Sequence, residues 1–246
     1  GTNTYLVGCG AARLLVDTGE GVPAWKEELS KVLLAEDCTV SDVILTHHHK
    51  DHVLGVGDVF DLTGGEVPVW KWPHTEAGLA YDVPPYLPLR EGQRFETMGA
   101  SLVVRHTPGH TSDSVSLVFE EEGSVFCGDT VLGMGSTVFS DLKPYMDSLA
   151  LLRGMAPTRL YCGHGPVVGA DPDDVDEQCS SAVDKVEEYI GHRLEREQQV
   201  LEALVASGRC TATDIAVLLY EDIPPHLMQA AANNVILHLR KLEVDG

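Results

Sequence analysis

The sequence is short of basic residues and lacks paired cysteines, and each shortage excludes classes of protein. Lysine and arginine number 17 against 38 aspartates and glutamates, which gives a formal net charge of −21 at pH 7. Such an acidic surface repels RNA, DNA and anionic membranes. The six cysteines form no Cys-x-x-Cys pair, so neither a disulfide framework nor a cysteine zinc site is expected. Free thiols in a reducing compartment account for them.

Long apolar runs and a serine-nucleophile motif are also missing. No stretch reaches the roughly 20 apolar residues of a membrane-spanning helix, so no membrane partner is expected. No signal peptide is visible, and no Gly-x-Ser-x-Gly pattern occurs. The chain opens at Gly1 without a methionine, so a targeting segment could be missing. We expect an intracellular protein, of the cytoplasm or the mitochondrion.

The densest set of ligand-type side chains lies in residues 46–52, which follow an apolar strand. Within this metal loop, His47, His49, Asp51 and His52 are spaced as metal ligands. Imidazole and carboxylate groups suit zinc, and four of them in one tight loop can serve two metal ions. A solvated histidine cluster or a tag remnant is the alternative. A tag would not follow an apolar strand or carry an aspartate, so the metal interpretation is favoured.

Three further ligand-type side chains follow apolar strands later in the chain. His110, Asp129 and His164 each come directly after a glycine, which lets the backbone turn at the strand end. Loops at the carboxyl ends of strands are where α/β folds build their sites. Each residue alone would more often be structural. Together with the metal loop they give seven candidate ligands, enough for two metal ions if one carboxylate bridges them.

Two other features have two interpretations each. Asp17 ends the predicted strand Arg13–Val16, and it is either a turn residue or a carboxylate that orients a ligand histidine. Trp70 and Trp72 lie in a Gly- and Pro-rich region, residues 63–99, and either belong to the core or wall a pocket. The core is the favoured place for the two tryptophans.

The C-terminal third has a helical pattern. Residues 183–205 carry an amphipathic stripe, Thr211 with Asp214 resembles a capping box, and a third helix follows the two prolines at 224 and 225. We predict one domain over residues 1–172 and a second over 173–246. The second would comprise a long helix and a winged-helix-like helical domain without its wing.

The motifs, in their order, resemble the metallo-β-lactamase superfamily. They are Thr-His-His-His-Lys-Asp-His, Pro-Gly-His-Thr, Cys-Gly-Asp-Thr and Cys-Gly-His-Gly. Within the superfamily the chain is more similar to the lactamase-beta-like protein 2 group and to polyketide acyl-carrier-protein thioesterases than to glyoxalase II. The resemblance covers nearly the whole chain. It implies an α/β protein, a four-layer αββα sandwich with a small C-terminal winged-helix-like helical domain.

The resemblance also implies a ligand set, a cofactor and a role for each residue. Two zinc ions per chain are expected, with Asp129 bridging them and Asp51 both ligating and passing a proton to the leaving group. Asp17 is the candidate partner behind a ligand histidine. The implied ligands of the first metal are His47, His49 and His110, and those of the second are Asp51, His52 and His164.

Hydrolysis of an acyl thioester by a hydroxide held between the two metals is the favoured function. The substrate would be a small molecule or a carrier protein. An endoribonuclease that cleaves single-stranded RNA is the alternative, which the acidic charge disfavours. A redox protein or a binding module is a third possibility, and two features disfavour it. Redox members of the superfamily carry Glu where His49 stands, and a binding module would be expected to have lost ligands. The third C-terminal helix has Arg240 and Lys241 only at its end, so packing or dimerisation suits it better than reading nucleic acid.

Overall fold

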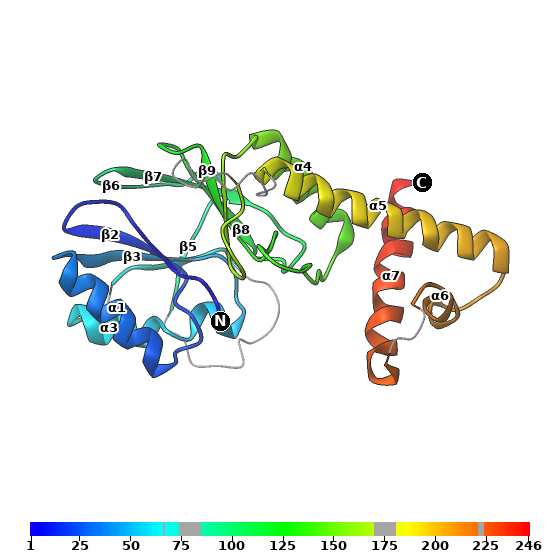
Figure 1. Ribbon diagram of the computed structural model, residues 1–246, viewed down its shortest axis with the longest axis horizontal. Helices are drawn as coiled ribbons and strands as arrows, with labels where there is room; N and C mark the ends of the chain where they lie inside the picture. The colour runs from blue at the N-terminus through cyan, green and yellow to red at the C-terminus, as the bar shows by residue number, and fades with distance from the viewer. Residues whose placement is uncertain (66, 74–84, 170–180, 221–223) are drawn as a thin grey trace.

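The computed structural model describes residues 1–65, 67–73, 85–169, 181–220 and 224–246. Two five-stranded sheets face each other in this part of the chain, and helices cover their outer faces (Figure 1). The predicted αββα sandwich is therefore confirmed. The predicted boundary between residues 172 and 173 lies outside the described residues. In the described residues, no helix has the length and apolar character needed to cross a membrane.

The first sheet has one antiparallel pair, β1 with β2, and is otherwise parallel. Its strands run in sequence order across the sheet: β1 (Tyr5–Val7), β2 (Ala12–Val16), β3 (Thr39–Leu45), β4 (Val69–Lys71) and β5 (Leu87–Pro88). Three helices accompany it: α1 (Pro23–Ala35), α2 (Lys50–Val53) and α3 (Val56–Thr63).

The second sheet is antiparallel except for one parallel pair at its edge, β9 with β10. Its strand order is β10 (Leu160–Cys162), β9 (Ser124–Gly128), β8 (Val115–Phe119), β7 (Ala100–His106) and β6 (Arg94–Thr97). Figure 1 shows α4 (Leu142–Met155) and the start of α5 (Ala182–Ser207) beside this sheet.

Strands β2 and β3 of the first sheet are buried on both faces, as their apolar runs predict. In β2, Leu14 and Val16 point into the core between the two sheets, and Leu15 points to the core under α1 and α3. In β3, Ile44 lies between the sheets and its two neighbours face the helices. The alternation follows from the two-residue period of a strand. This alternation also sets the side of the sheet toward which the residues after each strand point.

Two helices begin close to the metal loop. Helix α1 begins at Pro23, because Gly19 and Gly21 before it have φ values of 69° and 73°, in the left-handed region that a right-handed helix cannot use. Helix α2 begins at Lys50, so Asp51 and His52 of the metal loop lie within it.

The C-terminal helices form a separate apolar cluster at the end of α5. Here α6 (Ala212–Leu219), a 3₁₀ turn η1 (Pro225–Leu227) and α7 (Met228–Asp245) pack together, and Figure 1 shows α7 crossing α5. The capping box of Thr211 and Asp214 is confirmed, since each accepts from the other's backbone N–H. No strand occurs in the described residues from 181 onward.

The two tryptophans pack against the core between the sheets. Trp70 contacts the ring of Phe95 at 5.3 Å between centroids and donates a hydrogen bond to Asp42. Trp72 stacks on the ring of His106, with centroids 4.1 Å apart. The core interpretation therefore holds for both.

Candidate metal centre

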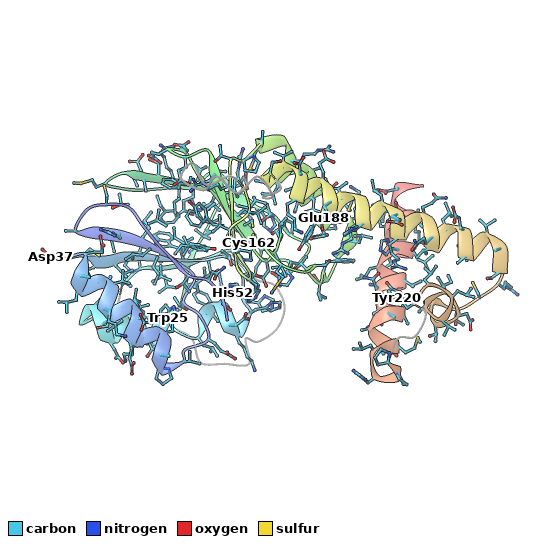
Figure 2. All side chains as sticks on the ribbon, viewed as in Figure 1. Trp25, Asp37, His52, Cys162, Glu188 and Tyr220 are labelled. Carbon is cyan, nitrogen blue, oxygen red and sulfur yellow. The ribbon has the colours of Figure 1, made fainter. Side chains whose placement is uncertain are left out.

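The seven predicted ligands meet at one rim of the sandwich. The metal loop follows β3, while Asp129 and His164 follow β9 and β10, two neighbouring parallel strands. His110 lies in the loop between β7 and β8. Figure 2 shows His52 close to Cys162, where the two sheets meet. The fold brings all seven together, and their role as ligands stays a prediction.

The seven side chains form two groups whose ligand-type atoms lie within 4.8 Å of one another in each group. Asp129 lies against both groups. Its Oδ2 is 3.7 Å from His110 Nε2 and 3.2 Å from His164 Nε2, and its Oδ1 is 3.5 Å from His52 Nε2. The first group is His47, His49, His110 and Asp129, and the second is Asp51, His52 and His164.

Asp17 lies behind the metal loop and holds two of its residues. One carboxylate oxygen accepts from the backbone N–H of Thr46 at 2.7 Å, and the other accepts from the Thr46 hydroxyl and from His52 Nδ1, both at 2.8 Å. Asp17 also has a φ of 58°, so it is a turn residue as well. Asp17 therefore lies in a turn and also contacts His52, and its role behind a ligand histidine stays a prediction.

These contacts decide which ring nitrogen of each histidine is left for a metal. The Thr46 hydroxyl gives its only proton to Asp17, so it must accept from Nδ1 of His47, 3.0 Å away. His110 Nδ1 donates to the carbonyl oxygen of Val138 at 2.6 Å. In His47 and His110, the Nε2 atom therefore carries a lone pair that faces the centre. In His52, Nδ1 is held by Asp17, so Nε2 is the atom that a metal ion would reach by displacing its proton. Such a partner behind the ring is the usual arrangement for a metal-binding histidine.

Three histidines of the first group are set to be neutral. Burial and the neighbouring rings lower the pKa of His47 well below its ordinary value. The same causes lower the pKa of His49 to about 4. Burial also lowers the pKa of His110, and the backbone hydrogen bond to Val138 only partly offsets this effect. Neutral imidazole is the form that binds a metal ion.

The second group is set to hold positive charge. Burial lowers the pKa of His52, but the carboxylates of Asp17 and Asp129 outweigh it and raise the pKa to about 10. Burial raises the pKa of Asp129, yet the neighbouring rings of His164, His52 and His47 hold it well below its usual range. The carboxylates therefore stabilise a cation at this position.

The donor set fits a metal pair by a further test. His47 Nε2, His52 Nε2 and Asp129 Oδ1 are buried and have no hydrogen-bond partner among the described residues. Burying three such polar atoms costs free energy unless something satisfies them, and a metal pair would satisfy all three. Nitrogen and carboxylate donors suit zinc, but other divalent ions accept the same set.

Glycines allow the loops to approach each other at the centre. A Cβ atom on Gly163 would lie 2.2 Å from Asp129 Oδ1, so a larger residue there would displace the carboxylate. Gly109 has a φ of 134°, and a Cβ atom on it would lie 2.3 Å from the Cα of Tyr145 in α4. The turn that carries His110 can therefore rest directly on α4.

Sequence reasoning missed a buried network beside the metal loop. Asp113 accepts from Lys71 Nζ at 2.5 Å, from His48 Nδ1 at 2.9 Å and from the Thr111 hydroxyl at 2.7 Å. Burial opposes the charged form of Asp113, but these partners hold its pKa well below its usual range. The network ties β4 to the metal loop and to the turn after His110. A lysine in an otherwise apolar strand was the one available signal.

The Asn3 side chain was missed as a site residue. Its amide nitrogen donates to the carbonyl oxygens of Cys162 at 3.0 Å and Gly165 at 2.8 Å. These bonds hold both sides of the turn that carries His164. No local pattern indicates this role, since the partners lie about 160 residues away.

We expect Asp113→Asn to destabilise the fold by about 3 kcal/mol at pH 7, because it leaves the buried ammonium of Lys71 without a carboxylate. Since the folded pKa of Asp113 is depressed, its stabilisation is full above the unfolded pKa of about 3.9 and is lost as pH falls below it. The difference in the free energy of unfolding between wild type and Asp113→Asn should therefore become smaller in acid. Urea denaturation of chelator-treated protein at pH 7 and near pH 3 measures it.

The control for Asp113 is Asp147→Asn, which breaks an exposed pair with Lys143. Exposed pairs contribute less than about 1 kcal/mol, so this variant should remain close to wild type. A gap for Asp113→Asn that widens as pH falls would contradict the assignment of its ionised form to the folded state.

Residues 1–164 match the family model of the metallo-beta-lactamase superfamily, and residues 211–246 match the beta-lactamase associated winged helix domain. The chain therefore belongs to the metallo-beta-lactamase superfamily, and it combines a hydrolase fold with a candidate metal site. The predicted superfamily and the C-terminal winged-helix domain are both confirmed.

Two named relatives and one solved structure show what the chain is similar to within the superfamily. The chain is 40% identical over 255 residues to the beta-lactamase-like protein 2 homolog of Drosophila melanogaster, covering 100% of this chain and 83% of that protein. It is 33% identical over 240 residues to the atrochrysone carboxyl ACP thioesterase of Aspergillus chevalieri, covering 94% and 71%. The structure of a beta-lactamase domain protein from Burkholderia ambifaria shares the fold, with a TM-score of 0.80, 22% identity and coverage of 100% and 82%.

Proposed function

We propose that this chain is a dinuclear zinc hydrolase that cleaves acyl thioesters of a small molecule or a carrier protein. The observation that carries the proposal is the placing of two ligand-type groups against one buried carboxylate, Asp129. In this assignment His47, His49 and His110 would hold one ion, Asp51, His52 and His164 would hold the other, and Asp129 would serve both. Two bound zinc ions would supply a hydroxide nucleophile at neutral pH and polarise the scissile carbonyl group.

Asp51 is the residue proposed to move a proton. Its side chain is 35% exposed, and its Oδ2 lies 3.2 Å from His164 Nε2 and accepts from the Thr2 hydroxyl at 2.8 Å. A cleft of about 550 Å³ opens beside it and is also lined by Trp25, Lys50 and His164. A carboxylate at this position can take a proton from the nucleophile and pass it to the leaving group. A thiolate leaving group needs little such help, because a thiol has a pKa of about 8.5.

The charge of the molecule supports a thioester over RNA. RNA binding takes most of its affinity from lysine and arginine that neutralise phosphates. Many of the basic side chains here are already paired with carboxylates, among them Lys26, Arg94 and Lys143. Arg193 and Arg196 donate to backbone carbonyl groups and lie over aromatic rings. These contacts leave little positive surface for a long strand.

Endoribonuclease activity on single-stranded RNA is the second candidate, because the same metal pair can cleave a phosphodiester.

A groove near the first ligand group supports an acyl thioester as the substrate. A groove of about 440 Å³ lies between α7 and the loop whose Val138 carbonyl holds His110. Its apolar side chains include Phe139, Ile236 and Leu237, and its polar ones are Ser140, Asn233, Asn234 and Arg240. The apolar part of this groove offers a surface for an acyl chain.

The proposal is tested by comparing kcat/KM for an acyl-CoA or acyl-carrier-protein thioester with kcat/KM for single-stranded RNA. Both are measured on one zinc-loaded sample at equal, moderate salt. We expect thioester turnover and little RNA cleavage, with His49→Ala abolishing the thioester reaction. Efficient RNA cleavage that depends on His49, together with no thioester turnover, would establish the nuclease instead.

A further inference from the structure

The segment of residues 132–139, here called the 132–139 loop, carries the acceptor that orients His110. His110 Nδ1 donates to the carbonyl oxygen of Val138 at 2.6 Å, which leaves Nε2 directed at the centre. The buried Thr137 hydroxyl donates to the backbone carbonyl oxygen of Asp129 at 2.7 Å and lies 3.4 Å from His110 Nδ1. The position of this loop therefore decides how the His110 ring is held.

Helix α5 holds the 132–139 loop from the C-terminal half of the chain, through two side chains one helical turn apart. Arg193 Nη2 donates to the carbonyl oxygen of Thr137 at 3.0 Å and to the Ser136 hydroxyl at 2.6 Å. The Tyr189 hydroxyl accepts from the backbone N–H of Leu132 at 3.1 Å. Residues four apart lie on one helix face, so α5 holds the loop at both ends.

The guanidinium of Arg193 is itself fixed by aromatic rings. Its central carbon lies 5.0 Å from the ring centroid of Phe139, 5.8 Å from that of Tyr145 and 5.9 Å from that of Tyr189. The rings attract the cation and restrict its plane, so the Arg193 side chain is already restricted when it bonds to the loop. A lysine would keep the charge but not the planar set of donors.

We propose that Arg193 is a positioning residue for the metal centre, which fixes the 132–139 loop so that the Val138 carbonyl keeps His110 Nε2 directed at the metal. Arg193 touches none of the proposed ligands and acts on His110 through the 132–139 loop, and the inference rests on the proposed metal assignment. His110 belongs to the first ligand group. Loss of Arg193 should therefore weaken that site and leave the site of Asp51, His52 and His164 nearly unchanged.

Arg196 provides a matched control on the same helix. Its guanidinium lies 4.4 Å from the ring of Tyr220, and Nη1 lies 3.4 Å from the carbonyl oxygen of Leu219. Figure 2 shows Tyr220 among the C-terminal helices, well away from His52. Removing Arg196 loosens the packing of α6 on α5 without touching the 132–139 loop. Comparing the Arg196 variant with the Arg193 variants therefore separates the effect of helix packing from the effect of loop positioning.

The test measures the two zinc dissociation constants of the full chain by competition with a chelator, in wild type, Arg193→Gln, Arg193→Lys and Arg196→Gln. We expect one of the two constants to rise by about 10- to 100-fold in Arg193→Gln, with Arg193→Lys intermediate and Arg196→Gln unchanged. Amide exchange in the metal-free protein gives a second readout. Exchange in Arg193→Gln should quicken in the 132–139 loop, and exchange in Arg196→Gln should not.

Ser136→Ala keeps the proposal testable if Arg193→Gln does not fold, because it removes only one contact at an exposed residue. We expect a smaller rise in the same dissociation constant. Unchanged constants in the folded Arg193 variants and in Ser136→Ala would overturn the proposal, as would an equal loss in Arg196→Gln. If wild type itself binds no zinc, the metal assignment fails; if wild type binds two ions and the variants match it, only the role of Arg193 fails.

Discussion

Asp51→Ala should abolish thioester turnover while the protein stays folded. We expect kcat/KM to fall by about a thousandfold or more, because the change removes both a metal ligand and a carboxylate that can carry a proton. The side chain is partly exposed at the start of α2, and its contacts are the Thr2 hydroxyl and the rings of His52 and His164. Since no core packing is lost, the free energy of unfolding should change by less than about 1 kcal/mol.

Two comparison variants make the Asp51 result specific. Asp51→Asn keeps the size of the side chain and can still accept from Thr2, but it lacks the negative charge and the capacity to take a proton. It should be nearly as inactive as Asp51→Ala. Asp61→Ala removes an exposed carboxylate that pairs with Lys26 on α1, and it should retain full activity. Normal turnover in purified, zinc-loaded Asp51→Ala would be inconsistent with the proposed role.

The part of the centre that could be predicted from sequence is the part that depends on local spacing. His47, His49, Asp51 and His52 lie within one loop, so their spacing alone placed them together. His110, Asp129 and His164 were found because each follows a strand and a glycine. The buried strands and the capping box at Thr211 also follow from patterns only a few residues long, whereas the αββα order was implied by the family resemblance.

The contacts that orient these side chains were not predictable from sequence alone. Lys71 meets Asp113 across 42 residues, and Arg193 meets Thr137 across 56. Each pair joins elements that become neighbours only when the second sheet and α5 pack against the rest. The Val138 carbonyl that holds His110 belongs to the backbone, whose hydrogen-bonding groups are the same for any residue type. Asp17 was left with two interpretations because its φ and its contact with His52 are both properties of the folded chain.

The pairing of the two ligand groups predicts how many zinc ions each ligand variant should keep. Asp129 approaches His110 on one side and His52 and His164 on the other, so its carboxylate can bridge two ions. Removing it should weaken both sites together. Removing His164 should weaken only one, because its ring belongs to the second group alone. Asp129→Ala and His164→Ala should therefore differ in the number of zinc ions that remain bound.

The most direct test of the account is a zinc titration of the metal-free protein, with bound metal and thioester turnover followed in the same samples. We expect the chelated protein to be inactive, and turnover to rise until about two zinc ions are bound per chain. Asp129→Ala should bind little zinc over the same range and stay inactive. Full turnover in metal-free protein, or saturation of both signals at one zinc ion per chain, would contradict the dinuclear hydrolase.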